Sequence, residues 1–170
     1  MKPVKQRLLD EGMREHALTI QERVKLLEKN RLFSGLTNQQ LQSIAPLFDL
    51  YQAPARSYVC REGDQSDFIC LVCSGRVAVS KNDHNNLPKI IATVGPGQTV
   101  GEMSVIDGGR RSASLVVQMP SLLLVLNSEN FGRMEEDAPR LWGRIMLQLA
   151  GILSKRLRQT SGVLAEYLPD

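Results

Sequence analysis

The chain has 170 residues, of which 42% are hydrophobic, and this is enough for one buried core with some length left for a terminal arm. Its 21 basic and 18 acidic side chains give a formal net charge of +3, well short of what a protein held on nucleic acid mainly by phosphate neutralisation shows. The charged N-terminus lacks the apolar centre of a signal peptide and no apolar run reaches about 18 residues, so we expect a cytoplasmic protein without a membrane partner.

The first part of the chain is predicted to be helical. We expect residues 1 to about 33 to form helix, with 1–30 serving as an arm ahead of the main domain. Two residue pairs are typical of capping boxes, in which a hydroxyl side chain and an acidic or amide side chain three positions later close a helix N-terminus. These pairs are Thr19 with Glu22 and Thr37 with Gln40. The second pair predicts a short helix that starts at Thr37.

From residue 48 onward the pattern changes to short apolar or alternating runs. They are FDLYQ, SYVCR, FICLVCSG, RVAVSK, KIIATV, SASLVVQ and SLLLVLN. Turn residues lie between them, including Ser74-Gly75 and Pro120. Many short strands with such frequent turn signals predict an antiparallel sandwich or jelly-roll barrel. The predicted fold class is therefore α+β, mainly β: an antiparallel jelly-roll β-barrel flanked by N-terminal helices and a long C-terminal helix.

The helical period returns near residue 128. Ser128 is a good N-cap residue, and Pro139 suits the start of the last helix. Apolar residues cover more than one face of this last helix, so it must be buried against the barrel. The remaining apolar surface either completes the core of the monomer or contacts a second subunit or a ligand. We expect the domain to end near residue 160, with 161–170 as a tail.

The three cysteines are predicted to be buried structural thiols. Their odd number does not suggest a disulfide framework. Cys70 and Cys73 formally match the C-x-x-C pattern, but they lie in an apolar run that is typical of a strand. Residues three apart on a strand point to opposite faces, so these thiols should not form a metal site or a redox pair.

The segment 95–114, GPGQTVGEMSVIDGGRRSAS, is the candidate functional loop. It is no Walker A loop, because Gly101 is followed by Glu102 and Met103, and it lacks the dinucleotide glycine spacing. A helix N-terminus near Glu102, together with Arg111 and the Ser112 hydroxyl, could bind one phosphate. The Glu102 carboxylate would then need a donor on the ligand, and sugar hydroxyls are natural candidates. These groups together indicate a nucleotide.

The segment VGEMSVIDGGRRSAS resembles the phosphate-binding cassette of the cyclic nucleotide-binding domain family. Four further segments occur in the family's order, so the resemblance covers about residues 31–160: LFSGLTNQQLQSIAPLF, REGDQSD, VCSGRVAV and VGPGQTVGE. The resemblance implies that Glu102 accepts a hydrogen bond from the ribose 2′-hydroxyl, near the Gly101 backbone, and that Arg111 binds the cyclic phosphate. It also implies further phosphate contacts, from backbone amides of Met103, Ser104, Ser112 and Ala113 and from the Ser112 hydroxyl.

The resemblance predicts a regulatory receptor for cAMP, or less favourably cGMP, with no other cofactor. Ser112 does not separate the two bases, because the family places a hydroxyl residue there with both. Arg156 and Arg158 could reach the base edge as a lid, although a basic last turn that complements the helix dipole is the simpler interpretation.

Ligand binding is expected to move the last helix and so to signal to a protein partner or within a homodimer that uses the helical segments. The alternative is a nucleotide-independent interaction or oligomerisation domain with the same fold. Neither a catalytic constellation nor metal-ligand spacing is present, so we expect no enzyme and no metal. The sequence stops at Asp170, about ten residues past the expected end of the last helix, so we expect no helix-turn-helix module.

Overall fold

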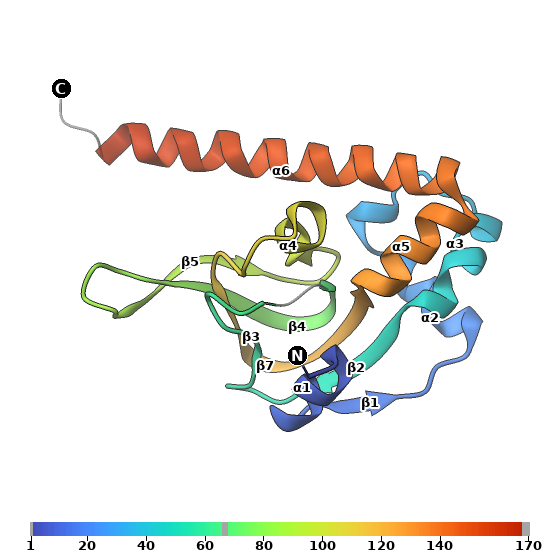
Figure 1. The fold of residues 1–170 in the computed structure, drawn as a ribbon, viewed down its shortest axis with the longest axis horizontal. Helices are drawn as coiled ribbons and strands as arrows, with labels where there is room; N and C mark the ends of the chain where they lie inside the picture. The colour runs from blue at the N-terminus through green and yellow to red at the C-terminus, as the bar shows by residue number, and fades with distance from the viewer. Residues whose placement is uncertain (1, 66–67, 168–170) are drawn as a thin grey trace.

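The computed structural model describes residues 2–65 and 68–167, in which the strands form one seven-stranded antiparallel sheet (Figure 1). The strand order is β1-β2-β7-β4-β5, with β3 also paired to β7 and β6 to β4. The strands are β1 (Arg14–His16), β2 (Asp49–Ala53), β3 (Tyr58–Cys60), β4 (Phe68–Asn82), β5 (Pro88–Val94), β6 (Thr99–Val100) and β7 (Ser114–Asn127). The α-helices are α1 (Val4–Asp10), α2 (Ile20–Glu28), α3 (Asn38–Ile44), α4 (Glu102–Asp107), α5 (Ser128–Asp137) and α6 (Pro139–Tyr167). Two 3₁₀ turns, η1 (Arg31–Phe33) and η2 (Ala45–Leu47), follow α2 and α3.

Two apolar cores lie on the two faces of the sheet, and strand alternation sorts the residues between them. On β4, Phe68 and Cys70 belong to a core enclosed by the strands, which we call the strand-enclosed core. Ile69 and Leu71 belong to a core shared with the helices, which we call the helix-side core. Helices α2, α3, α5 and the first half of α6 cover the latter core at one end of the sheet (Figure 1). This arrangement confirms the predicted α+β class, with its antiparallel strands and C-terminal helix.

The C-x-x-C pair lies as its strand position predicts. Cys70 is in the strand-enclosed core, while Cys73 packs against the helix-side core, so the two thiols face opposite sides of the sheet. Both are free thiols, as is Cys60. Burial raises the pKa of all three, and that of Cys73 rises to about 11. These thiols are therefore structural.

The two predicted turns inside the long strands were wrong. β4 continues through Ser74-Gly75 and β7 continues through Pro120, with shifts in register where these residues oppose one another. Gly75 has φ +86°, and a Cβ there would lie 2.1 Å from the Ser121 Oγ and 2.6 Å from the Pro120 carbonyl oxygen. Glycine and proline thus mark a bulge in a strand pair and not the end of either strand.

The N-terminal segment is not helical throughout, contrary to prediction. α1 ends in a Schellman motif, in which the Gly12 amide donates to Leu9 and the Met13 amide donates to Leu8. β1 follows and pairs with β2, which adds a strand to the edge of the sheet. All three β1 side chains are exposed, so this short strand carried no burial pattern that the sequence could reveal.

The predicted helix starts are confirmed at three places and wrong by one residue at a fourth. Both capping boxes form, at Thr19 before α2 and at Thr37 before α3. Pro139 begins α6 as expected. The N-cap of α5 is Asn127 rather than Ser128, because the Asn127 side chain accepts from the Asn130 amide at 2.8 Å.

Helix α6 runs the length of the molecule, and its second half extends past the helix-side core (Figure 1). In the first half, Leu141, Ile145 and Leu149 are buried in that core. In the second half, Leu157 and Val163 are 68% and 56% exposed. The helix continues past residue 160 to Tyr167. Within the described ranges, none of the helices has the length and apolar character that a membrane crossing needs.

Candidate functional site

Helix α4 begins and ends at glycines in the left-handed region. Gly101 is its N-cap with φ +84°, and Gly108 is its C-cap with φ +68°. β6 leads into the helix and is fixed to β4 by the pairing of Val100 with Cys70. The short helix is thereby anchored at one end to the sheet, and the loop after it carries Arg111.

The Arg111 guanidinium is buried at the end of β4 and is only 4% exposed. Its Nη1 donates to the Gly101 carbonyl at 2.6 Å, and its Nη2 donates to the Phe68 carbonyl at 2.7 Å. It also stacks on the Phe68 ring, with 4.3 Å from Cζ to the ring centroid. A Cβ at position 101 would lie 2.5 Å from Nη1, so the absence of a side chain on Gly101 allows the close approach.

Glu102, the first residue of α4, is 1% exposed. One of its carboxylate oxygens, Oε1, accepts from Arg156 of α6, and the same guanidinium donates to the Thr99 carbonyl. The other oxygen, Oε2, is buried and has no hydrogen-bond partner within the part of the chain that the structure describes. An unsatisfied buried acceptor costs about 1–3 kcal/mol, so this oxygen is well placed to accept from a ligand hydroxyl.

The two arginines of the predicted lid behave differently. Arg156 reaches from α6 across to Glu102 and Thr99. Arg158 donates instead to the Ser154 hydroxyl on its own helix. The side chain of Arg156 joins α6 to α4 and β6, which are far apart from it in the sequence. A basic residue that only complemented the dipole of its own helix would not make these contacts.

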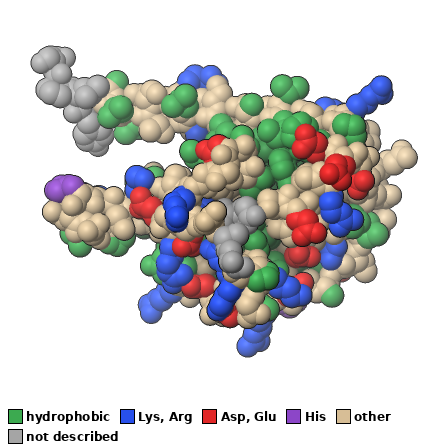
Figure 2. Space-filling model, viewed as in Figure 1, with side chains coloured by type: hydrophobic (Ala, Val, Ile, Leu, Met, Phe, Trp, Pro, Cys, Tyr) green, Lys and Arg blue, Asp and Glu red, His purple; other side chains and the backbone are tan. Residues whose placement is uncertain are grey.

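A cavity of about 850 Å³ brings these groups together between α4, β5 and the second half of α6. All the cassette residues predicted from the sequence line it: Gly101, Glu102, Met103, Ser104, Arg111, Ser112 and Ala113. Arg156 lines it as well, whereas Arg158 is not among the residues that do. Figure 2 shows the hollow between the projecting end of α6 and the β4–β5 hairpin.

Further lining residues were not predicted from the sequence. They are Val79, Lys81, Ile91, Ala92, Thr93, Val94, Gln98, Val100, Leu115, Gln159, Thr160 and Val163. Lys81 adds a positive charge near the cassette, where its Nζ donates to the Ser112 carbonyl at 2.8 Å. Ile91 is 60% exposed in the edge strand β5, and both its exposure and its edge position are visible only in the structure.

The cavity has a polar side and an apolar side. Arg111, Arg156 and Lys81, the last of which also pairs with Glu62, lie near one buried carboxylate, while three residues of β5 and Leu115 are apolar. Its volume is in the range of small-molecule sites, which commonly join an apolar wall to a few convergent polar groups. The arrangement can bind a ligand that has an anionic group, a hydroxyl donor and a flat or apolar part.

Comparisons with known proteins agree with this chemistry. Residues 51–137 match the family model described as the cyclic nucleotide-binding domain. The chain is 30% identical over 128 residues to a cyclic AMP receptor protein of Thermus thermophilus, covering 75% of this chain and 57% of that protein.

Solved structures give the same result. A crystal structure of a cyclic nucleotide-binding domain from Methylobacillus flagellatus aligns with TM-score 0.82 at 28% identity, over 93% of this chain and 91% of that chain. The catabolite activator protein of Thermus thermophilus aligns with TM-score 0.72 at 29% identity, over 80% of this chain and 62% of that chain. The chain spans 57% of the curated relative from Thermus and is therefore comparable to part of that protein.

Proposed function

Because the chain belongs to the cyclic nucleotide-binding domain family, we propose that it is a receptor for a cyclic mononucleotide, with cAMP preferred to cGMP. The observation that carries the proposal is the cavity in which buried Glu102 and buried Arg111 flank the two ends of the α4 segment. A relative that shares 30% identity is named a cyclic AMP receptor protein, and this supports the choice of cAMP.

Arg111 is proposed to bind the cyclic phosphate. Its guanidinium lines the cavity and could give a phosphate charge-assisted, bidentate hydrogen bonds, which are stronger than bonds between neutral groups. Lys81 adds positive charge on the same side of the cavity. Met103, Ser104, Ser112 and Ala113 also line the cavity and would complete the phosphate contacts with backbone amides and the Ser112 hydroxyl.

Glu102 is proposed to bind the ribose 2′-hydroxyl. Its Oε2 is a buried acceptor without a partner in the described structure, so a ligand hydroxyl would satisfy it. The base would then lie toward the apolar β5 wall and the second half of α6, where Ile91 and Val163 line the cavity.

Ligand binding is proposed to signal through α6. Arg156 bonds Oε1 of Glu102 and the Thr99 carbonyl, next to the Oε2 that the ribose hydroxyl would use, so ligand binding would change the surroundings of this ion pair. Residues in the second half of α6, beyond the helix-side core, would then change their packing, because Arg156 joins this half of the helix to the cassette. The exposed apolar residues of α6 that do not line the cavity, among them Leu157 and Leu164, are the proposed contact surface for a protein partner or a second subunit.

The binding proposal is tested by calorimetric titration of cAMP, cGMP, 2′-deoxy-cAMP and a cyclic dinucleotide. We expect cAMP to bind the wild type with the highest affinity and Arg111→Ala to weaken that binding about 30-fold or more. Arg158→Ala is the matched control, because it removes a nearby cation that does not line the cavity. Glu102→Ala, which removes the acceptor, should remove most of the preference for cAMP over 2′-deoxy-cAMP.

Two results would contradict this proposal. If no cyclic mononucleotide bound with Kd below about 1 mM, corresponding to about −4 kcal/mol, the receptor function would fail and the nucleotide-independent interaction domain would be favoured. Equal wild-type affinity for cAMP and 2′-deoxy-cAMP would refute the role of Glu102.

The signalling step is tested separately by amide hydrogen exchange of the protein with and without saturating cAMP. Unchanged exchange of α6 beyond residue 150 would refute the helix movement.

A further inference from the structure

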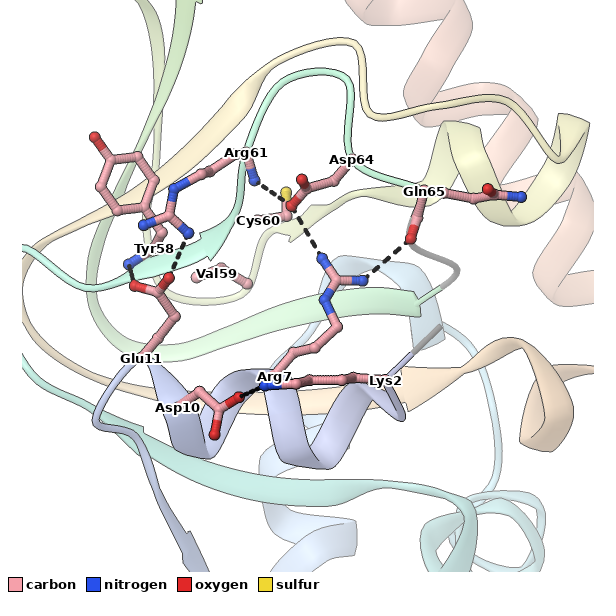
Figure 3. A pocket seen from close by; sticks show the side chains of 10 residues that line it. All are labelled: Lys2, Arg7, Asp10, Glu11, Tyr58, Val59, Cys60, Arg61, Asp64 and Gln65. Carbon is pink, nitrogen blue, oxygen red and sulfur yellow. Dashed lines mark hydrogen bonds and ion pairs between the residues drawn. The ribbon is translucent and has the colours of Figure 1, made fainter.

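Helix α1 packs against the turn of residues 61–65 at a second cavity of about 460 Å³ (Figure 3). Arg7 of α1 spans it. The Arg7 Nη2 donates to Asp64 Oδ2 at 2.9 Å, and its Nη1 donates to the Gln65 carbonyl at 3.2 Å. The side chains of Arg7 and Asp64 are 22% and 32% exposed, so this pair is better shielded than the surface ion pairs of the chain.

The Asp64 carboxylate also closes the turn on itself. Its Oδ2 accepts from the Arg61 backbone amide at 2.8 Å, in addition to the Arg7 guanidinium (Figure 3). One carboxylate oxygen therefore ties together the two ends of the turn and the helix α1. The contact between Arg7 and Asp64 joins residues 57 positions apart, so only the tertiary structure brings them together.

The backbone of the same turn is bonded to Arg111. The Arg111 amide donates to the Asp64 carbonyl at 2.9 Å, and the Gly63 amide donates to the Arg111 carbonyl at 2.8 Å. A third bond runs from Arg110 Nη1 to the Gly63 carbonyl at 2.9 Å. The position of the Arg111 backbone therefore depends on a turn that Arg7 of α1 holds through Asp64 and that Ser114 and Asn82 hold through Glu62.

We propose that Arg7 and Asp64 are positioning residues for Arg111, so that α1 tunes the affinity of the phosphate site from outside it. This inference rests on the proposed function of Arg111 as the phosphate ligand. Binding constellations need their groups within about 0.5 Å of the productive geometry, and this demands support from surrounding contacts. The Arg111 side chain is fixed by Gly101 and Phe68 at its tip, while its backbone depends on the turn.

The chain offers a matched control beside the same helix. Lys2 pairs with Asp10 of α1 at 2.8 Å, but both side chains are largely exposed, at 69% and 43%, and the pair lies within the N-terminal segment. Removing Lys2 deletes a cation and an ion pair next to the same cavity without touching the turn. Arg7→Gln and Lys2→Gln therefore separate the effect of the turn contact from the effect of charge.

The first measurement is residue-resolved amide hydrogen exchange of the full chain without ligand. Arg7→Gln should accelerate exchange at the amides of Gly63 and Arg111 by about threefold to tenfold, while amides in the β2–β7 pairing stay unchanged. Lys2→Gln should change neither, and Arg7→Lys, which keeps a donor and the charge, should recover part of the protection. Unchanged exchange at both amides, or equal acceleration throughout the sheet, would overturn the positioning role.

The second measurement is calorimetric titration of the same variants with cAMP. Arg7→Gln should weaken affinity about threefold to tenfold, as expected for a residue that acts through a physical network, and Lys2→Gln should stay within about twofold of the wild type. Accelerated exchange with unchanged affinity would overturn the link to the phosphate site. If the wild type bound no cyclic mononucleotide, the proposed function would fail, and the exchange data would still decide whether α1 positions Arg111.

Discussion

Replacing Gly101 by alanine tests the geometry of the candidate site directly. The backbone at this position has φ +84°, and an alanine in the left-handed region costs about 1–2 kcal/mol. The new Cβ would also lie 2.5 Å from Arg111 Nη1 and 3.1 Å from the Phe68 carbonyl oxygen. The guanidinium cannot move away without loss, because it is 4% exposed and donates to the Gly101 carbonyl.

The expected loss of stability follows from these two contributions. Losing a hydrogen bond from a charged group costs about 1.5–3 kcal/mol, so Gly101→Ala should lower the free energy of unfolding by about 3–5 kcal/mol in total. Gly108→Ala is the matched control at the other end of α4. It also has positive φ, at +68°, but no atom lies within 4 Å of its Cβ position, so it should cost only about 1–2 kcal/mol.

Equilibrium urea unfolding of the two variants and the wild type measures both losses. A difference between the variants of about 2 kcal/mol is expected from the Arg111 contact alone. The titration with cAMP should show the same order, with Gly101→Ala weakened and Gly108→Ala near the wild type. If the two variants lost equal stability within about 0.5 kcal/mol, the close approach of Arg111 would not be what requires glycine at position 101.

Three further variants and one labelling reaction test the fold. Gly75→Ala should destabilise by about 3 kcal/mol or more in urea unfolding, because its Cβ would lie 2.1 Å from the Ser121 Oγ; a loss below about 1 kcal/mol would contradict the tight bulge. Leu124→Ala, which empties a fully buried position, should cost about 2–5 kcal/mol by the same assay, whereas Leu157→Ala, 68% exposed, should cost about 0.5 kcal/mol or less. Burial raises the pKa of Cys73 to about 11. Iodoacetamide near neutral pH should therefore label this thiol far more slowly in the native protein than in urea, which mass spectrometry can measure. Equal labelling rates would contradict the burial of Cys73.

Features that depend on neighbouring residues were predictable from the sequence. The capping boxes at Thr19 and Thr37 use atoms three residues apart, and both form. The opposite faces of Cys70 and Cys73 follow from the strand period of two, and the two cores confirm them. The cassette residues from Gly101 to Ala113 form one short segment, so their presence in one cavity could be expected from their spacing.

Features that depend on pairing between distant segments were missed or misplaced. β1 was expected to be helical and β6 was not predicted, because each is two or three residues long and becomes a strand only through its neighbour in the sheet. The long strands β4 and β7 were divided at Gly75 and Pro120, since a turn and a bulge use the same residue types.

The sequence by itself determined which charged groups stand together: a carboxylate, Glu102, and a guanidinium, Arg111, at the two ends of a short glycine-bounded segment, with apolar strands to support them. Only the tertiary structure decided what surrounds that chemistry. Arg156 reaches Glu102 from 54 residues away, and Arg7 reaches Asp64 from 57 residues away. Contacts of this range depend on the path of the whole backbone, because no local propensity couples residues so distant in the chain.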